Sequence, residues 1–148
     1  LDSESYSPIY ESARDMDLCI VFHAGYDLAY PTDDAASPAR LGRVLDRVPG
    51  LRVCATHFGG WNAWNEVLEI LAGRDLYFGT SFTFGYIKEK LFWKIMEKHG
   101  TARIMFGSDS PWQSQSKLIA EIKKLDLEAR DKEKILYANA ATFFDLQV

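Results

Sequence analysis

The sequence has little of several features that mark particular classes of protein. It contains only two cysteines, Cys19 and Cys54, and both lie within apolar runs, so we expect no disulfide framework and a reducing, cytoplasmic location. No apolar run approaches the roughly 20 residues of a membrane-spanning helix. The first residues, LDSESYSPIY, lack both the basic region and the apolar core of a signal peptide. An initiating methionine is also lacking, which leads us to expect a piece of a longer or processed chain.

An excess of positive charge is lacking as well. The chain has 17 Lys and Arg against 21 Asp and Glu, which gives a net charge of −4. We therefore expect no general affinity for nucleic acid or for anionic membranes.

A hydrophobic content of 47% and a charged content of 26% in 148 residues are typical of a globular protein with a core. Residues 1–148 are accordingly expected to form a single domain.

Short apolar runs that are typical of strands alternate with segments of helical periodicity. The runs cover residues 18–22, 51–56, 76–78 and 104–107. The first is apolar throughout, which is typical of a strand covered on both faces. Ser-Pro pairs at Ser7 and Ser37 predict helix starts with serine as the cap. Apolar residues at helical spacing predict helices over residues 9–16, 38–48, 64–71, 87–99, 118–125 and 132–144.

This alternation predicts a parallel sheet of βαβ units in the α/β class. A doubly wound open sheet and a (β/α)8 barrel both satisfy it. The position of the polar residues favours the barrel. His23, His57 and Asp109 each follow a predicted strand, and Thr80-Ser81 occupies the equivalent place on the third strand. The carboxyl ends of parallel strands meet at one edge, where barrel enzymes carry their catalytic groups.

Two imidazoles and a carboxylate at one edge of a sheet suit a divalent metal such as zinc, manganese or iron. A bound metal lowers the pKa of water until it becomes a nucleophile. A carboxylate can accept the proton of that water, and a second imidazole can polarise a carbonyl or carry a proton. The chain has no HExxH motif, so this prediction depends on the fold. Taken singly, each residue fits an ordinary hydrogen-bonded loop histidine or a turn-capping aspartate.

Other polar and aromatic residues receive structural interpretations. His99 precedes Gly100 at a predicted helix end, where a cation suits the helix dipole. Trp112 follows the fourth strand and is expected either to line a pocket or to shield the end of the barrel. The remaining interpretations are packing for Trp61, Trp64 and Trp93, and solvent exposure for Arg40 and Arg43.

Four segments, VFHAG, THFGGW, RIMFGSDSPW and EKILYANAATFFDL, occur in an order that resembles the amidohydrolase superfamily. The similarity is to the amidohydrolase-related branch, which includes aminocarboxymuconate-semialdehyde decarboxylase-like and pyrone-dicarboxylate lactonase-like enzymes. It covers essentially the whole chain. The resemblance implies a metal-dependent (β/α)8 TIM barrel that acts on a small-molecule substrate. Four strands would be the C-terminal half of that barrel, strands five to eight.

The resemblance also implies roles for individual residues. His23 matches a metal ligand, and His57 matches a catalytic acid/base or electrophile that faces substrate or water. Asp109 matches a residue that is both metal ligand and catalytic proton acceptor, and Trp112 is expected to bind substrate. The implied cofactor is a divalent metal, with zinc expected and manganese as the alternative. Gly59-Gly60 would let the backbone turn sharply after His57.

The chain departs from the family in one respect. Its three histidines, His23, His57 and His99, all lie in other positions, so the chain lacks the His-x-His pair of the family's first strand. Two ligands remain, fewer than the three of a usual catalytic zinc site, so we expect weak or absent metal binding by this chain alone. A half-barrel also leaves open sheet edges, which predicts homo-oligomers or pairing with another half.

Three functions remain open at this point. The first is a metal-dependent hydrolase in which activated water attacks an amide, lactone or related bond. The second is a non-oxidative decarboxylase on the same scaffold, which would use the same residues. The third is a non-catalytic scaffold, which applies to the 148 residues in isolation.

Overall fold

The computed structural model describes residues 1–27, 29–30 and 32–147. Its centre is one four-stranded parallel sheet whose spatial order follows the chain, β1-β2-β3-β4. The strands are β1 (Cys19–Phe22), β2 (Arg52–Ala55), β3 (Tyr77–Gly79) and β4 (Ile104–Met105). The predicted alternation of parallel strands and helices is therefore confirmed.

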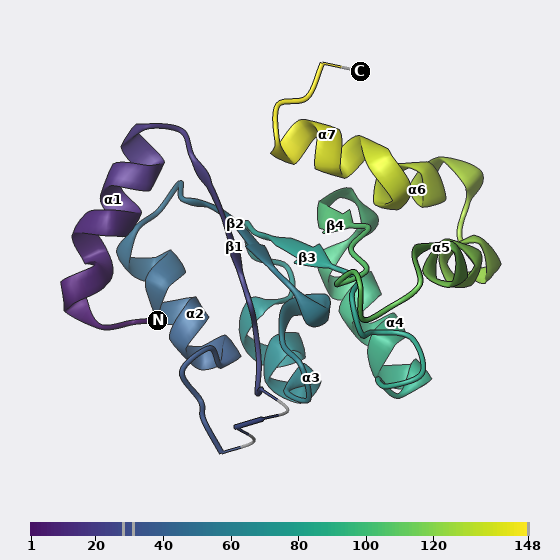
Figure 1. Ribbon diagram of the computed structural model, residues 1–148, viewed down its shortest axis with the longest axis horizontal. Coiled ribbons are helices and arrows are strands. Elements are labelled where there is room, and N and C mark those ends of the chain that lie inside the picture. Colours follow the sequence, from purple (N-terminus) through teal and green to yellow (C-terminus); the bar gives the residue numbers. More distant parts are fainter. Residues whose placement is uncertain (28, 31, 148) are drawn as a thin grey trace.

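Helices follow the strands in order around the sheet, with α1 beside β1 and α5 to α7 beyond β4 (Figure 1). None of the described helices has the length and apolar character needed to cross a bilayer. The α-helices are α1 (Ser7–Asp15), α2 (Pro38–Arg47), α3 (Trp64–Glu66), α4 (Glu89–His99), α5 (Gln115–Lys124), α6 (Ala129–Glu133) and α7 (Asn139–Phe143). Two π-helical segments, η3 (Val67–Leu71) and η5 (Lys134–Ala138), extend α3 and join α6 to α7, and the 3-10 turns are η1 (Glu4–Tyr6), η2 (His57–Gly59) and η4 (Thr101–Arg103).

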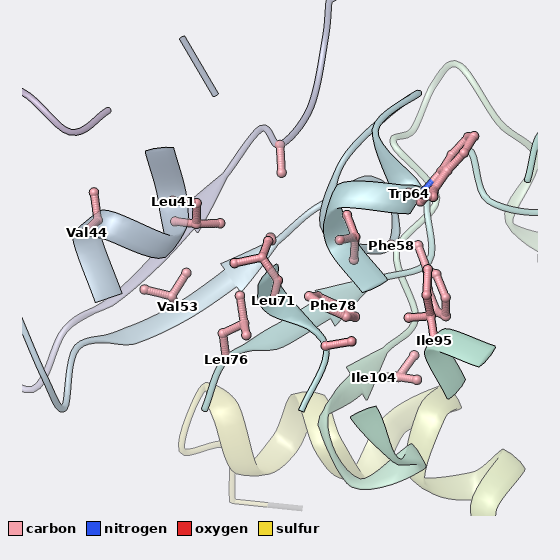
Figure 2. Packing of buried hydrophobic residues seen from close by; sticks show 14 of the residues in the cluster. Leu41, Val44, Val53, Phe58, Trp64, Leu71, Leu76, Phe78, Ile95 and Ile104 are labelled. Atoms are coloured by element: carbon pink, nitrogen blue, oxygen red, sulfur yellow. The ribbon is translucent and has the colours of Figure 1, made fainter. Parts of the chain in front are cut away.

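The core fills the space between the sheet and the helices, with most members from the sheet and helices α2 to α4 and others from α1, α5 and η5 (Figure 2). Each large apolar side chain buried there contributes about 1.5–3 kcal/mol to folding. Gly59 packs so closely that a Cβ would lie 2.7 Å from Phe78 and 2.8 Å from Val67, and its φ of +88° favours glycine. This confirms the predicted sharp turn after β2. The fully buried members include Leu41, Val44, Val53, Phe58, Leu71, Leu76, Phe78, Ile95 and Ile104.

One of the two predicted serine caps is confirmed. Ser37 precedes α2, and its Oγ accepts a hydrogen bond from the backbone N–H of Arg40 at 3.4 Å. The other prediction was wrong, because α1 begins at Ser7 itself and continues directly from η1. The Ser7 hydroxyl instead accepts a hydrogen bond from Arg47 at 3.2 Å.

Strand β4 is shorter than the predicted run 104–107, because the following backbone groups have partners outside the sheet. The N–H of Phe106 donates to the carbonyl of Ile135 in η5 at 2.7 Å. The N–H of Gly107 donates to Oγ1 of Thr80 at 3.1 Å. These bonds turn the chain away from the sheet two residues before the predicted strand end.

Strand β1 is not covered on both faces as predicted. Val21 is 50% exposed, and Leu18 just before the strand is 51% exposed. Side chains alternate between the two faces of a strand, and Ile20 and Phe22 pack against the core, so Val21 points to the opposite face. In half a barrel this inner face lacks the strands that would lie across from it. Within the described residues, no strand borders the other edge of β1 or the outer edge of β4. Among the described residues, the sheet therefore has two unpaired edges, one at β1 and one at β4, as expected of half a barrel. The two cysteines are both free, as predicted.

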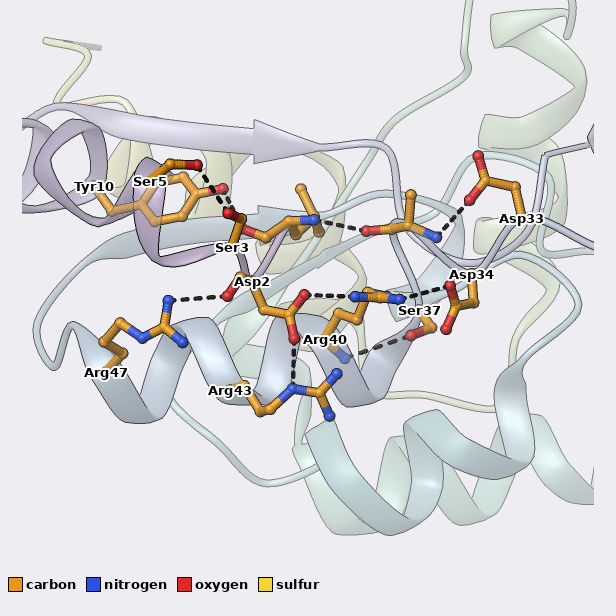
Figure 3. A network of polar contacts seen from close by, with 12 residues as sticks. Asp2, Ser3, Ser5, Tyr10, Asp33, Asp34, Ser37, Arg40, Arg43 and Arg47 are labelled. Atoms are coloured by element: carbon orange, nitrogen blue, oxygen red, sulfur yellow. Dashed lines mark hydrogen bonds and ion pairs between the residues drawn. The ribbon is translucent and has the colours of Figure 1, made fainter.

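Arg43 is exposed as predicted, whereas Arg40 is half-buried, and both form ion pairs that the sequence did not predict (Figure 3). Arg40 reaches Oδ1 of Asp2 at 2.8 Å and Oδ1 of Asp34 at 2.9 Å, and Arg43 reaches Oδ2 of Asp2 at 2.6 Å. Hydrogen bonds from Arg40 and then Arg43 hold the pKa of the Asp2 carboxyl well below its usual range. The pairs fasten the N-terminal segment to α2.

Candidate functional site

The carboxyl ends of the strands form the wall of one cavity of about 490 Å³. His23 follows β1, His57 follows β2, and Asp109 and Trp112 lie in the loop after β4. The structure therefore brings all four predicted site residues to one place. Tyr26, Asp27, Ala29, Trp61 and Phe82 complete the lining.

His23, His57 and Ser81 form a line of hydrogen-bonded side chains across three strand ends. Nε2 of His57 lies 3.1 Å from Nδ1 of His23, and the two ring centroids are 4.8 Å apart at 67°. Nδ1 of His57 lies 3.1 Å from Oγ of Ser81. Both ring nitrogens of His57 thus have partners.

The backbone after β2 holds His57 in an unusual conformation. His57, Phe58 and Gly59 have φ values of 56°, 55° and 88°, a region in which non-glycine residues are strained. Surrounding bonds maintain this geometry, because Oγ of Ser81 accepts the backbone N–H of His57 at 3.4 Å and the indole of Trp64 donates to its carbonyl at 3.0 Å.

Burial determines the protonation of His57, which is 5% exposed. Desolvation lowers the pKa of this imidazole, and the nearby His23 lowers it further, whereas the charge of Asp109 acts in the opposite direction. His57 is therefore neutral near pH 7, a state in which one nitrogen donates and the other accepts.

Asp109 and Trp112 belong to a turn at the mouth of the cavity. Asp109 is exposed and has a φ of 52°, and its carbonyl accepts the backbone N–H of Trp112 at 2.9 Å. Trp112 is 78% exposed while it lines the cavity. Of its two predicted positions, the pocket lining is the one observed.

Trp61, interpreted as a packing residue, forms part of an aromatic wall. Its ring meets His57, Phe82 and Tyr86 edge to face, with centroids 6.3, 5.6 and 4.8 Å apart. Phe82 was not predicted at all, although it follows Ser81, whose place at a strand end was a usable signal.

His99 lies outside this site, and its predicted cationic character was wrong. Its ring stacks on Phe78 with a centroid distance of 4.0 Å, and Nδ1 accepts the backbone N–H of Gly73 at 3.1 Å. Burial lowers the pKa of His99 to about 4, so the residue is neutral near pH 7. Its structural role is supported by these contacts.

The cavity offers metal-ligating side chains of the right type for a divalent metal, but too few of them. His23 offers an imidazole and Asp109 a carboxylate, both ordinary ligands of zinc or manganese. Yet in the described part of the chain, no group of three or more His, Cys, Asp or Glu residues could hold a metal ion. A catalytic zinc usually has three protein ligands. Two candidate ligands are fewer than such a site needs.

Solved structures share this fold. Dihydroxybenzoic acid decarboxylase from Polaromonas sp. JS666, solved with manganese and the inhibitor 2-nitroresorcinol, matches with a TM-score of 0.73 and 19% identity over 98% of this chain and 55% of its own. An uncharacterised TIM-barrel protein from Bordetella bronchiseptica matches with a TM-score of 0.83 and 22% identity, over 98% and 52%. A putative 2-pyrone-4,6-dicarboxylic acid hydrolase from Pseudomonas putida matches with a TM-score of 0.72 and 18% identity, over 99% and 59%.

The chain thus spans about half the length of the solved structures it matches. Its four parallel strands are half of a TIM barrel, which decides between the two architectures left open by the sequence. Residues 1–146 match the family model Amidohydro_2, described as Amidohydrolase. The chain belongs to the amidohydrolase family.

Proposed function

We propose that the whole protein is a metal-dependent enzyme of the amidohydrolase type that transforms a small, planar molecule in this cavity. The observation that carries the proposal is the meeting of His23, His57 and Asp109 in one cavity. Aromatic walls from Trp61, Phe82 and Trp112 suit a flat ring, since aromatic side chains pack well against planar groups.

The proposed roles follow the chemistry of each group. His23 and Asp109 would hold the metal together with ligands from the other half of the barrel, and the four strands would correspond to strands five to eight. The metal, when bound, is a Lewis acid that lowers the pKa of water. Manganese in two similar structures supports a divalent ion without deciding between manganese and zinc. His57, neutral near pH 7, polarises a substrate group or carries a proton, and Asp109 accepts one.

Hydrolysis of a lactone, amide or related bond is the first proposed reaction, and the similarity to a putative pyrone-dicarboxylic acid hydrolase supports it. Non-oxidative decarboxylation is the second. The similar structures of 2,6-dihydroxybenzoate and 5-carboxyvanillate decarboxylases support that alternative. All three compounds are planar ring acids, so the aromatic walls suit either reaction.

The described residues alone offer two ligands, so we propose that the 148-residue chain in isolation is a scaffold with weak or absent metal binding. Metal analysis after gel filtration tests this proposal. Stoichiometric zinc or manganese on the isolated chain would contradict it.

The experiment on activity uses the full-length protein that contains this chain, loaded with manganese or zinc. We expect Asp109→Asn to lower turnover of a planar ring acid by about 10²- to 10⁴-fold, and His23→Ala to lose metal. Asp27→Asn is the matched control, because Asp27 lines the same cavity and has no assigned role. Full activity of Asp109→Asn would contradict the assignment. Release of carbon dioxide indicates decarboxylation, and incorporation of ¹⁸O from labelled water indicates hydrolysis.

A further inference from the structure

We propose that Gln113 is a positioning residue that holds Phe82 in the wall of the cavity and so determines how wide a ring the site accepts. The inference rests on the proposed function for its ligand, a planar ring acid. It goes further by naming the residue that sets the size of that ligand. Phe82 is among the residues that line the cavity and Gln113 is not, so the effect of Gln113 is exerted through Phe82.

Phe82, in the loop after β3, has a backbone conformation that needs support. Its φ of 49° lies in the left-handed region, where a residue with a side chain is strained. Such a conformation persists only where neighbouring groups hold it. The ring of Phe82 contacts His57, Trp61 and Tyr86, with centroids 5.9, 5.6 and 5.7 Å away. A shift of this backbone would therefore move an aromatic wall of the cavity.

The side chain of Gln113 supplies that support from a different loop. Its Oε1 accepts the backbone N–H of Phe82 at 2.6 Å. Only the oxygen end of an amide can accept a hydrogen bond, so the backbone donor also fixes which way the Gln113 amide points. Both residues are half-buried, and water competes less for this bond than it would at an exposed site. The bond joins the loop after β3 to the loop after β4.

The backbone on both sides of Gln113 is fixed by hydrogen bonds of its own. Before it, the N–H of Trp112 donates to the carbonyl of Asp109 at 2.9 Å. After it, Ser114 is the N-cap of α5, and its Oγ accepts the N–H of Lys117 at 3.5 Å. Gln113 is therefore a firm anchor for the loop that it bonds.

The bond ties together two aromatic groups of the cavity, because Phe82 and Trp112 both line it. A wall that is held in place before binding loses no freedom when a ligand enters, and this favours the ligand that fits it. With the bond intact, we expect the site to prefer a single ring over a fused pair of rings. Without it, the walls separate more easily and that preference should decline.

The first test examines the bond itself by amide hydrogen exchange of the ¹⁵N-labelled protein without metal or ligand. We expect slow exchange of the Phe82 N–H in the wild type. Gln113→Met keeps the length of the side chain but not its acceptor, so exchange should be about 3- to 10-fold faster. Gln113→Glu keeps an acceptor oxygen and should retain the slow rate. Gln115→Met, the same change at an exposed position in α5, should also retain it.

The second test examines ligand size in the full-length protein loaded with manganese. Quenching of tryptophan fluorescence gives the dissociation constants of salicylate and of 3-hydroxy-2-naphthoate, which carries the same groups on two fused rings. We expect Gln113→Met to lower the preference for salicylate by about 3- to 10-fold. Gln113→Glu should restore the preference, because its added charge affects the single carboxylate of each ligand alike. Gln115→Met should leave the preference unchanged.

Fast exchange of the Phe82 N–H in the wild type would overturn the inference, as would an unchanged ligand preference in folded Gln113→Met. If Gln113→Met does not fold, Gln113→Asn takes its place, since its amide is one carbon too short to reach Phe82. Binding of both acids with an unchanged preference counts against Gln113 alone, whereas binding of neither acid by the wild type counts against the proposed function.

Discussion

His57 and His99 show how the same side chain acquires different roles from its neighbours. Both are buried imidazoles, and burial lowers the pKa of each. His57 faces a cavity and a second imidazole, whereas His99 is enclosed between Phe78 and backbone groups. His57 therefore borders open space, whereas His99 accepts the backbone N–H of Gly73 inside the core.

The burial of His99 predicts a dependence of stability on pH. Its pKa is about 4 in the folded chain and 6.5 in the unfolded chain, so between these values the unfolded state binds a proton that the folded state does not. The free energy of unfolding therefore falls as the pH drops from 6.5 to 4, by roughly 3 kcal/mol from this residue. Urea unfolding at several pH values measures the effect.

The matched variant is His99→Asn, whose amide oxygen can take the place of Nδ1 as acceptor for Gly73. Its free energy of unfolding should depend less steeply on pH, by up to about 1.4 kcal/mol per pH unit. Identical slopes for the wild type and the variant would show that His99 is not the responsible group.

Gly25 lies against the backbone of Trp61, one of the residues that wall the cavity. A Cβ on Gly25 would lie 2.1 Å from the Trp61 nitrogen, so Gly25→Ala must displace this segment. We expect a loss of several kcal/mol, beyond the about 1 kcal/mol for alanine at positive φ alone. Gly100→Ala provides that baseline, because Gly100 also has positive φ but open space around it. Equal thermal unfolding of the two variants would refute the expected clash.

At the scale of elements, Asn139 fastens the C-terminal helices to the end of the sheet. It is 7% exposed, and its Nδ2 donates to the carbonyls of Thr101 and Ile104, both at 2.7 Å. We expect Asn139→Ala to lose about 1–3 kcal/mol, because two buried acceptors lose their donor. Asn65→Ala, at an exposed site, should have almost no effect. Urea denaturation compares them, and an equally small change in both would contradict the fastening role.

The sequence predicted the strand ends better than the strand lengths. Apolar runs and the polar residues after them depend on local patterns, and so the positions of His23, His57 and Asp109 were correct. The early end of β4 depends on a bond from Phe106 to Ile135, which no local pattern contains. For the same reason the π-helical segments were not predicted, and the place of Trp61 in the cavity wall was missed.

At the scale of the whole molecule, apolar side chains lie exposed near both open edges of the sheet. On the β1 side they are Tyr6, Ile9, Met16, Leu18 and Val21, and on the α7 side they are Tyr137, Phe144 and Leu146. Open edges and exposed apolar patches favour association with another chain. We therefore propose that the isolated chain self-associates through these edges.

Size-exclusion chromatography with light scattering tests this proposal. We expect a species larger than a monomer, with a reduced mass for Val21→Lys because a charge at an edge strand opposes pairing. Glu69→Lys, exposed on η3 away from both edges, should not change the mass. A well-behaved monomer over a wide range of concentration would contradict the proposal.

The spatial order β1-β2-β3-β4 has a further consequence for how the chain acquires its structure. Among the described residues each strand pairs with its neighbour in the chain, but a whole helix with its loops separates the paired residues, as between Cys54 and Tyr77. A parallel pair can form only after this crossover segment has returned the chain to the sheet, and such long-range pairing makes folding slow. We therefore expect this chain to refold more slowly than a helical bundle of similar length.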